Sequence, residues 1–582
     1  MIIGVHVAGD VKGGLGMSEA LCAETFAFLT QKAKIKDVVE ANMFDKTTGF
    51  IAPQTDVLLL GAVQKCMAHR ETGISQVIPT ECSGEIFPIY CAPPVLSKYD
   101  VRIQDNPYSP MQEGVNKHGL VTKNFDLDYL ETAYDDLNNK ILSFVKPCRI
   151  RVGKLPVEMA IVGHPSLPHY DKLDFDTSEG FPYSAMRSGS DKGKKWLLDL
   201  EQDANGVYTL NGLHPFLEEV MESKHNQRLK RHLPFTLFVD CLKDRKLPIT
   251  KAITPGKVRI FSISPLDFTI QCRQVFMDFT VAYQEARFAV EHAVGIDVNS
   301  YEWTDMVNSL LDRGNNIITL DYKGYGPSLN ALCAEYSIRI IRNWYMHNGD
   351  LSTENDLCRE MMGYEQIHSA HLCMKMVYRT LCGLPSGGPL TVILNSLVNC
   401  LYIRITWIII FTENLDYQSP SMSAFAAHVT FFVYGDDVIM SVTDEVKDYY
   451  NSLTMADVLQ KHNIGISNAA KDNEMVKYLS CLDKDTSFLK HNILPHPKRP
   501  GVFLAALDRT SVEDTCNWTF KTWKYKLREI SLESCDATVR SAYGHGPDYF
   551  NVVRQKCQIY WQKKGVHLPL PTWRDIDRQN FG

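Results

Sequence analysis

The stretch His428 to Val442 reads HVTFFVYGDDVIMSV, and the interpretation of the whole chain starts from it. Two apolar runs, 428–433 and 438–442, are rich in β-branched and aromatic residues, which favours strands. Tyr434-Gly435-Asp436-Asp437 lies between them and has the composition of a tight turn. The stretch therefore predicts a β-hairpin with two carboxylates at its bend. Taken alone, it is equally an ordinary solvated turn.

A third carboxylate follows a second strand pattern. Asn316 to Leu320 (NIITL) is β-rich and ends at Asp321. If this strand neighbours the hairpin, Asp321, Asp436 and Asp437 meet on rigid backbone. Such a group suits two Mg2+ ions about 3.5–4 Å apart, which stabilise the attacking and leaving oxygens of nucleotidyl transfer. The meeting is a tertiary prediction, because the strand and the hairpin are far apart in sequence.

Helical patterns surround these strands. Apolar residues recur at helical spacing over 328–347, 389–410 and 444–462. Together the patterns predict an α+β layer arrangement. The run Leu401 to Phe411 is too short to span a bilayer, so we expect it to be the buried end of a helix.

Composition adds two constraints. The net charge of -7 argues weakly against a nucleic-acid partner, but a channel needs only local positive charge. Six cations lie between residues 243 and 259: Lys243, Arg245, Lys246, Lys251, Lys257 and Arg259. This run is also compatible with a solvated loop. The 16 cysteines include no C-x-x-C pair, which indicates reduced thiols rather than a zinc site.

Further motifs occur in a fixed order. They are Thr177-Ser178-Glu179-Gly180-Phe181-Pro182-Tyr183, Lys243-Asp244 with Gly256-Lys257-Val258-Arg259-Ile260, His292-Ala293-Val294-Gly295, Asp321-Tyr322-Lys323-Gly324-Tyr325, Gly383-Leu384-Pro385-Ser386-Gly387-Gly388-Pro389 with Thr391 and Asn395, Tyr434 to Asp437, Ala470-Lys471-Asp472, and Phe488-Leu489-Lys490. Over about residues 175–495 this series resembles the RNA-dependent RNA polymerases of picornavirus-like positive-strand RNA viruses (Picornavirales), in the order of their motifs G, F, A, B, C, D and E. Gly326 and Gly388-Pro389 are most similar to the insect iflaviruses.

The resemblance implies a right-hand fold of fingers, palm and thumb, with an antiparallel palm sheet flanked by helices. The expected divisions are an N-terminal linker and fingers segment over 26–100, fingers over 101–300, a palm over 301–487 with a fingers insertion near 348–380, and a thumb over 488–582. Trp518, Trp523 and Tyr525 in the thumb have roughly helical spacing, which favours core positions over a platform for stacking bases.

The resemblance also assigns roles to residues. Asp321, Asp436 and Asp437 would hold two Mg2+ ions, for which Mn2+ can substitute. Lys471 would be a general acid toward pyrophosphate, although an ordinary surface lysine is an equal alternative. The expected nucleotide-binding residues are Lys243, Lys257, Arg259, Ser386, Thr391 and Asn395. The expected RNA-binding residues are Thr177, Ser178, Gly180, Gly387 and Lys490.

Two of these residues have alternatives, and one position departs from the family. Ser386 would recognise the ribose 2′-hydroxyl or simply form a turn, and Asn395 would do the same or be a satisfied buried amide. The commonest motif A carries a second Asp five residues after the first, where this chain has Gly326. Glycine offers no acceptor, so Asn395 and Ser386 would carry more of the ribose recognition.

The N-terminus resembles a different protein. Gly4-Val5-His6-Val7-Ala8-Gly9 and Gly14-Leu15-Gly16 are similar to the end of a picornavirus-type chymotrypsin-like cysteine protease, so residues 1–25 would be a protease remnant. An accidental match in a glycine-rich tail is the alternative. The resemblance implies a polyprotein precursor containing the protease, RNA template and product, ribonucleoside triphosphates and a possible protein primer as partners. It also implies the host cytoplasm, at membrane-associated replication complexes.

Two other functions share parts of this pattern. A reverse transcriptase has a similar palm and an Asp pair after Tyr, but the Ser386-Gly387 to Asn395 pattern and the basic run argue against it. A non-catalytic RNA-binding protein could keep the fold, but intact Asp321 and Asp436 argue against that.

Overall fold

The two strand patterns that carry the carboxylates are neighbours in one antiparallel sheet. The computed structural model describes residues 35–36, 57–63, 73–189, 193–468 and 475–582. The palm sheet has the order β13-β14-β10-β15. Its strands are β10 (Asn316–Tyr322), β13 (Val429–Tyr434), β14 (Asp437–Val442) and β15 (Ile466–Asn468). β10 pairs with β14 from Asn316 opposite Val442 to Leu320 opposite Val438, which confirms the predicted neighbourhood.

Alternation along these strands separates two faces of the palm sheet. Ile318 and Leu320 of β10 pack in the largest core together with α14 (Thr391–Thr412). Ile317 of β10 and Ile439 of β14 pack instead with α10 (Tyr301–Arg313). The sheet is therefore covered by helices on both faces, as the α+β prediction requires.

Helix α14 is the central helix of the protein. Among the described residues it is the one helix that is long and apolar enough to cross a membrane, but 89% of its apolar window is buried inside the protein. It packs against α4 (Leu127–Phe144), α12 (Ala331–His347) and α16 (Ser452–Lys461). The prediction that 401–411 is the buried end of a helix is confirmed.

A six-stranded sheet carries the basic run. Its order is β1-β2-β12-β11-β7-β9. The strands are β1 (Ile35–Lys36), β2 (Leu58–Val63), β7 (Leu237–Leu242), β9 (Ile260–Ile263), β11 (Ala370–Cys373) and β12 (Met376–Arg379). The neighbouring helices are α3 (Pro110–Val115), α5 (Val157–Val162), α6 (Tyr183–Met186), α7 (Pro215–Leu229), α8 (Ile249–Ala252), α9 (Leu266–Glu285), α11 (Tyr325–Ser328) and α13 (Thr353–Ile367).

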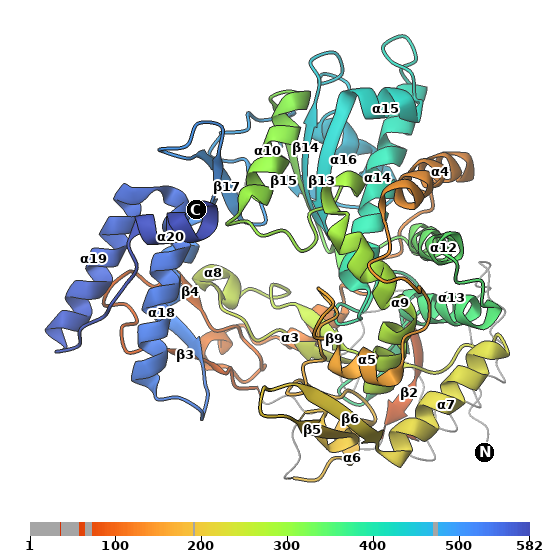
Figure 1. Cartoon of the computed structure of the whole chain (residues 1–582), viewed down its shortest axis with the longest axis horizontal. Coiled ribbons are helices and arrows are strands. Elements are labelled where there is room, and N and C mark those ends of the chain that lie inside the picture. Colours follow the sequence, from red (N-terminus) through yellow and green to blue (C-terminus); the bar gives the residue numbers. More distant parts are fainter. Residues whose placement is uncertain (1–34, 37–56, 64–72, 190–192, 469–474) are drawn as a thin grey trace.

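The C-terminal region forms a separate core. Its elements are β16 (Ser487–Phe488), β17 (His491–Pro495), β18 (Phe503–Leu507), α17 (Arg509–Glu513), β19 (Trp518–Phe520), α18 (Leu527–Ser541), α19 (Pro547–Lys563) and α20 (Trp573–Phe581). In Figure 1 the helices α18, α19 and α20 lie on the side of the molecule opposite α7 and α13.

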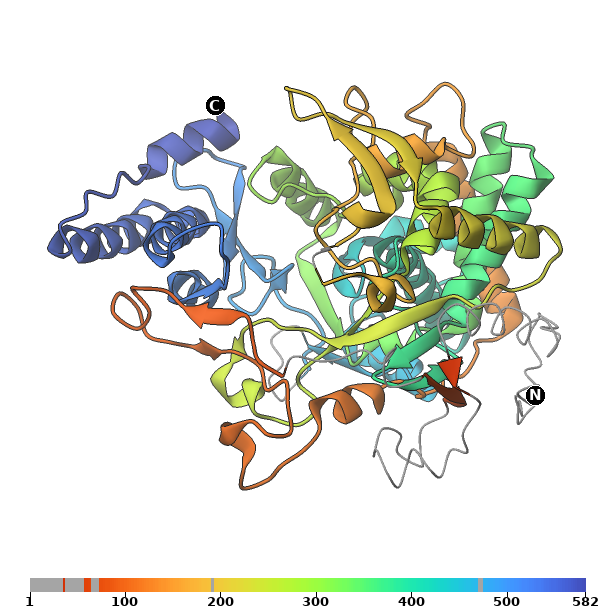
Figure 2. The same cartoon turned by 90° about the horizontal axis from the view of Figure 1, so that it is seen from below.

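An N-terminal segment joins that C-terminal core. Strand β3 (Val77–Pro79) pairs with β19, and Cys82 and Phe87 are buried among the C-terminal helices. Figures 1 and 2 both place β3 beside these helices. Part of the segment that was expected to belong to the fingers thus contacts the expected thumb. The predicted boundaries between fingers, palm and thumb stay predictions.

The remaining strands form two small sheets. These are β4 (Cys91–Ala92) with β8 (Leu247–Pro248), and β5 (Leu198–Gln202) with β6 (Tyr208–Leu213).

Two expectations from the sequence are wrong. The helix expected over 444–462 begins only at Ser452, because the Asn451 side chain caps it by accepting from the backbone of Leu453 and Thr454. Trp523 and Tyr525 are not core residues, since 81% and 57% of their surface is exposed. They lie in a loop between β19 and α18, where helical spacing has no meaning.

Candidate active site

Three carboxylates gather at one end of the palm sheet. The ladder between β10 and β14 reaches Leu320 opposite Val438, so its next step sets Asp321 opposite Asp437. Period-two alternation puts both residues on the face of Ile317 and Ile439, away from α14. Asp436 occupies the turn that joins β13 to β14, and all three side chains are half-buried.

Two side chains of α14 hold the carboxylate-bearing turn. The Gly435 N–H donates to Ser396 Oγ at 2.9 Å, and Asn399 Nδ2 donates to the Gly435 carbonyl at 2.9 Å. The Tyr322 hydroxyl donates to Asn399 Oδ1 at 2.8 Å, which links the clamp to the strand of Asp321. The sequence interpretation missed this clamp. Its signal is a pair of polar residues three apart in a predominantly apolar helix.

The donor set fits a hard divalent cation. Asp321, Asp436 and Asp437 offer only carboxylate oxygens, which Mg2+ prefers. In the part of the chain that the structure describes, no group of three or more His, Cys, Asp or Glu side chains is arranged to hold a metal ion without further ligands. Mg2+ sites commonly use one or two carboxylates and complete their coordination with water and substrate phosphates, so an incomplete cage agrees with the chemistry.

Cations from the six-stranded sheet face the carboxylates. The Lys243 N–H donates to the Arg259 carbonyl at 2.8 Å, so both residues extend the β7–β9 ladder by one step. Burial, then Arg245, Arg259 and Lys490, lower the pKa of the Lys243 ammonium, and Asp436 opposes them. These influences identify a positive cluster within electrostatic reach of the Asp436 turn. Lys257 and Arg259 are exposed, as free access for a phosphate requires.

The hairpin that carries Lys490 turns sharply. Phe488 pairs with His491, which leaves Leu489 and Lys490 as a two-residue loop. Both have a left-handed φ, of 53° and 64°, which is uncommon for residues other than glycine. The turn presents an exposed Lys490 toward the positive cluster.

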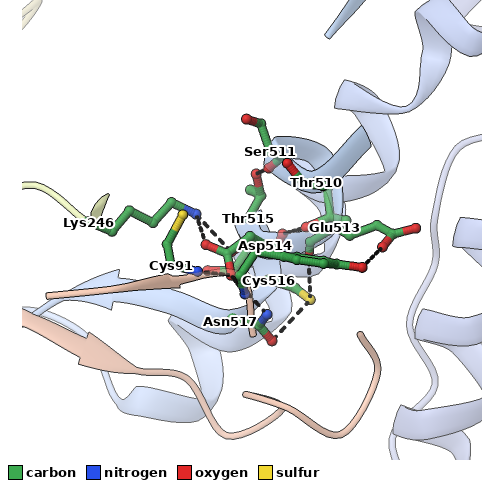
Figure 3. Close-up of polar contacts among 12 residues, drawn as sticks. Cys91, Lys246, Thr510, Ser511, Glu513, Asp514, Thr515, Cys516 and Asn517 are labelled. Atoms are coloured by element: carbon green, nitrogen blue, oxygen red, sulfur yellow. Dashed lines mark hydrogen bonds and ion pairs between the residues drawn. The ribbon is translucent and has the colours of Figure 1, made fainter. Parts of the chain in front are cut away.

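Not every cation of the basic run lines this site. Lys246 Nζ lies 2.9 Å from a carboxylate oxygen of Asp514, which is fully buried in the C-terminal region. Figure 3 shows Lys246 and Cys91 approaching Asp514 from one side while Asn517 lies beside it. The backbone N–H groups of Tyr90 and Cys91 also donate to this carboxylate, at 3.0 and 3.3 Å. Lys246 therefore ties two regions together.

The loop before α14 packs against β9. A Cβ atom on Gly387 would lie 2.2 Å from the Ser262 carbonyl oxygen, so only glycine fits there. The Ser386 hydroxyl accepts from the Ser262 N–H at 3.3 Å. The Thr391 hydroxyl donates to the Pro385 carbonyl at 2.8 Å, so it stabilises the loop that precedes α14.

Asn395 retains an unused acceptor. Its Oδ1 is buried and has no hydrogen-bond partner among the described residues, while its carbonyl accepts from the Tyr325 hydroxyl at 2.8 Å. A Cβ on Gly435 would lie 3.9 Å from the Asn395 Cβ, so this amide neighbours the carboxylate turn. An orphaned acceptor at that place suits a ligand hydroxyl. Gly326, the other position relevant to ribose, faces open space.

The predicted RNA-binding loop lies at the far end of β9. Gly180 has a φ of +75°, and a Cβ there would lie 2.7 Å from the Ser264 carbonyl oxygen and from Pro265 Cα. The Thr177 hydroxyl donates to the Asp174 carbonyl at 2.9 Å, and Ser178 Oγ accepts from the Gly180 N–H at 3.3 Å. Both contacts shape the loop, which remains accessible at Thr177.

A buried network that the sequence interpretation missed supports β9 from behind. The Ser262 hydroxyl donates to Asp240 at 2.8 Å, and His371 and Tyr378 contact the same carboxylate at 2.9 and 2.5 Å. Burial alone would raise the pKa of Asp240, but His371 holds it below its ordinary value. Asp240 therefore remains an acceptor that fixes the strand beneath the Ser386 loop.

Two predictions lie outside the described residues. Lys471 and the expected protease remnant over 1–25 both fall there.

The fold and the site define a class. Carboxylates at the end of an antiparallel sheet, faced by cations from a second sheet and flanked by a C-terminal helical region, are the plan of a right-hand nucleic-acid polymerase. Residues 88–560 match the viral RNA-dependent RNA polymerase family, and the chain belongs to that family. The family consists of RNA-directed RNA polymerases and implies metal-dependent catalysis in general.

Known proteins agree with this assignment. The chain is 37% identical over 99% of its length to the genome polyprotein of Deformed wing virus, an iflavirus, of which it covers 20%. It is 26% identical over 95% of its length to the replicase polyprotein of Drosophila C virus, of which it covers 32%. The chain thus spans about a fifth to a third of these relatives. The predicted likeness to iflaviruses is confirmed.

A solved structure supports the fold independently. The Sicinivirus 3Dpol RNA dependent RNA polymerase superposes with a TM-score of 0.70 at 19% identity, covering 88% of this chain and 96% of the other. The predicted right-hand fold is confirmed.

Proposed function

We propose that this chain copies an RNA template by joining ribonucleoside triphosphates to the 3′-hydroxyl of an RNA or protein-linked primer, as part of the replication of a positive-strand viral genome. The observation that carries the proposal is the juxtaposition of Asp321, Asp436 and Asp437 opposite the cluster around Lys243. Carboxylate oxygens that suit metal ions thus face lysine and arginine side chains that suit phosphates.

The carboxylates would hold two Mg2+ ions, with Mn2+ as a substitute. When bound, such ions stabilise the attacking and leaving oxygens of the transfer. Asp321 and Asp436 would be the main ligands, with Asp437 assisting.

The remaining residues would bind and orient the nucleotide. Lys243, Lys257 and Arg259 would grip the triphosphate, and the planar guanidinium of Arg259 suits bidentate phosphate contact. Asn395 Oδ1 would accept a hydrogen bond from the ribose 2′-hydroxyl, next to Ser386. Thr391 would support the loop from which Ser386 projects.

Further roles concern the RNA and the leaving group. Thr177, Ser178, Gly180, Gly387 and Lys490 would lie along the RNA. Lys471 would protonate the departing pyrophosphate, which eases its release. The unused acceptor of Asn395 favours a ribonucleotide over a deoxyribonucleotide.

The proposal extends to the setting of the enzyme. The chain would be released by a protease from a polyprotein precursor. It would act in the host cytoplasm at membrane-associated replication complexes, where a small virus-encoded protein could supply the primer. Cleavage of the expressed precursor into a polymerase fragment that lacks the expected protease remnant over 1–25 would test the first point.

One experiment separates the proposal from its rivals. Purified protein is given an RNA primer-template with either ribonucleotides or deoxyribonucleotides, with and without Mg2+. The proposal requires Mg2+-dependent incorporation of ribonucleotides. Preferred incorporation of deoxyribonucleotides would indicate a reverse transcriptase, and RNA binding without any incorporation would indicate a non-catalytic protein.

A further inference from the structure

Gly326 leaves space beside the residues that would bind the ribose. The residue is only half-buried. Apart from its chain neighbours and its own helix, no described atom lies within 4 Å of the Cβ that a side chain there would carry. Packed carbon atoms are ordinarily about 3.5–4 Å apart, so this direction has room for a further group.

Two contacts hold the backbone of Gly326 against the Ser386 loop. The Leu384 N–H donates to the Gly326 carbonyl at 3.0 Å, and Leu384 lies two residues before Ser386. A Cβ on Gly383 would lie 2.7 Å from the same carbonyl oxygen, so the two segments approach closely. The carbonyl side of Gly326 is therefore packed, while its side-chain direction is open.

The preceding residue joins Gly326 to Asn395. The Tyr325 hydroxyl donates to the Asn395 carbonyl at 2.8 Å. Asn395 also carries the buried Oδ1 that has no partner among the described residues. The open position, the Ser386 hydroxyl and the unused amide thus lie on three segments that contact one another: α11, the Ser386 loop and the first turn of α14.

None of these three positions requires a hydrogen-bond donor on the sugar. A carboxylate at position 326 would be an acceptor only, and an ether oxygen could not satisfy it. The Ser386 hydroxyl, which accepts from the Ser262 N–H, can still donate its own proton. The Asn395 amide presents its oxygen or its N–H groups, depending on which way it is turned. An acceptor at the 2′ position of a sugar can therefore be paired as well as a hydroxyl.

We propose that the nucleotide site accepts ribonucleoside triphosphates whose 2′-oxygen carries a small substituent such as a methyl group. The substituent would occupy the space in front of Gly326, while Ser386 and Asn395 donate to the ether oxygen. The transfer itself is unchanged: the primer 3′-oxygen bonds to the α-phosphorus and pyrophosphate departs. The inference rests on the proposed function, since it assumes that a nucleotide binds here.

Glycine at position 326 also has a backbone reason. The next residue is Pro327, and proline disfavours helical backbone in a preceding residue that carries a Cβ. This requirement explains why glycine is suitable there, but it does not fill the space beside it. The test must therefore separate the effect of any Cβ at position 326 from the effect of a filled space.

The test compares 2′-O-methyl-UTP with UTP in single-nucleotide incorporation on one RNA primer-template with Mg2+. For the unchanged protein, kcat/KM for 2′-O-methyl-UTP should lie within about 100-fold of that for UTP, the cost of at most one poorly made hydrogen bond. Gly326→Asp fills the space and adds an obligate acceptor, so it should widen this gap by about tenfold or more. Gly326→Ala adds the Cβ but fills less, so it should widen the gap less.

Gly212→Asp is the matched control. No described atom outside its chain neighbours lies within 4 Å of a Cβ at Gly212 either, but this glycine belongs to the separate β5–β6 sheet. The substitution should leave the ratio of the two kcat/KM values unchanged. Thermal unfolding will show that each variant folds.

Two results would overturn the inference. The first is a preference of the unchanged protein for UTP beyond about 100-fold. The second is a gap that Gly326→Asp widens no more than Gly212→Asp does, because the substituent would then not lie in front of position 326. A failure of the proposed function looks different, since the unchanged protein would not incorporate UTP at all.

Discussion

At the scale of single residues, Gly435 connects the turn that carries the carboxylates to the core. Its N–H and its carbonyl are both bonded by α14, through Ser396 and Asn399. The turn that carries Asp436 is therefore held in place by the largely buried helix α14. Because Tyr322 bonds the same amide, a shift of this clamp would move Asp321 as well.

Removal of the clamp should lower activity more than stability explains. Asn399→Ala leaves the Gly435 carbonyl and the Tyr322 hydroxyl without a partner, which costs about 1–3 kcal/mol of unfolding free energy. We expect kcat to fall and the Mg2+ concentration for half-maximal activity to rise, while the KM for primer-template stays constant. Ser396→Ala should show the same pattern, and Ser396→Thr, which keeps the hydroxyl, should recover part of it.

Ser337→Ala provides the control. Ser337 is equally buried, but among the described residues its hydroxyl bonds only the Cys333 carbonyl of its own helix. It should lose little stability and no Mg2+ response. If the clamp variants merely unfolded earlier, with an unchanged Mg2+ requirement, the clamp would be a structural contact alone.

Sequence patterns identified some residues and missed others for physical reasons. The positions of Asp321 and Asp436 at strand ends could be predicted, because each follows a β-rich run in the sequence. Ser396 and Asn399 could not, since buried polar residues acquire meaning only from what they contact. Gly326 was identified as a departure, and the open space around it is a property of the fold.

At the scale of elements, β9 organises the site. Arg259 stands at its start, the Ser386 loop packs on its middle and the Gly180 loop lies at its end. Asp240 supports the strand from behind. Strand β9 thereby positions three segments that are distant in sequence side by side along its length.

Substitution of Gly387 should displace the Ser386 loop from β9. The Cβ of Gly387→Ala would stand 2.2 Å from the Ser262 carbonyl oxygen, so the loop or β9 must move. A misplacement of about 1 Å costs about 100-fold in rate, and we expect a loss of that order in single-nucleotide incorporation. Gly212→Ala in β6 is the control, because nothing lies within 4 Å of its Cβ. Near-normal incorporation by Gly387→Ala would show that the loop contact is dispensable.

The Lys246–Asp514 ion pair is a second contact that joins distant elements. Lys246→Met leaves a buried carboxylate without its cation, so we expect the free energy of unfolding to fall by about 2–3 kcal/mol. The double variant with Asp514→Asn should recover part of this loss. Lys447→Met, whose partner Asp444 is 79% exposed, should change nothing measurable.

The same pair has a defined pH dependence. Burial by itself would raise the pKa of Asp514, but Lys246 and the Tyr90 N–H hold that pKa below its ordinary value. Its stabilisation is therefore complete above pH of about 4, the value for an unfolded Asp, and is lost as pH falls through the lower folded value. The difference in stability between the unchanged protein and Lys246→Met should shrink in that acidic range. A difference that persisted unchanged there would exclude the ion pair as its cause.

Elements were predictable where periodicity is long and misassigned where it is not. The strands predicted over 316–320 and 428–433 and the helix predicted over 389–410 follow continuous patterns and are present, although the helix begins only at Thr391. Trp523 and Tyr525 were misassigned, because three aromatics at helical offsets do not make a helix without an apolar stripe to bury.

At the scale of the whole molecule, charge is segregated. The chain has a net charge of -7, yet Lys243, Arg259 and Lys490 gather where a phosphate would bind. Net charge governs solubility and encounter rather than the local potential of a channel. The overall topology could not be derived from periodicity alone. It followed from the resemblance, because pairing such as that of β3 with β19 joins residues far apart in sequence.

This segregation predicts a steep salt dependence. The affinity for single-stranded RNA should fall linearly with salt on logarithmic axes, by about 0.7 in slope per phosphate neutralised. Arg259→Ala should reduce the slope by about that amount. Arg339→Ala, exposed on α12, should leave it unchanged. A flat response in the unchanged protein would contradict a phosphate-lined path.

The proposed catalysis depends on carboxylates that hold cations, and Asp436→Asn tests this dependence most directly because the amide keeps the shape and removes the charge. Mg2+ is titrated in single-nucleotide incorporation on an RNA primer-template, with thermal unfolding as the check on folding. We predict that Asp436→Asn folds and binds RNA normally but incorporates about a hundredfold to a thousandfold more slowly at every Mg2+ concentration, a loss typical of removing transition-state charge stabilisation. Near-normal incorporation by a folded Asp436→Asn would contradict the site.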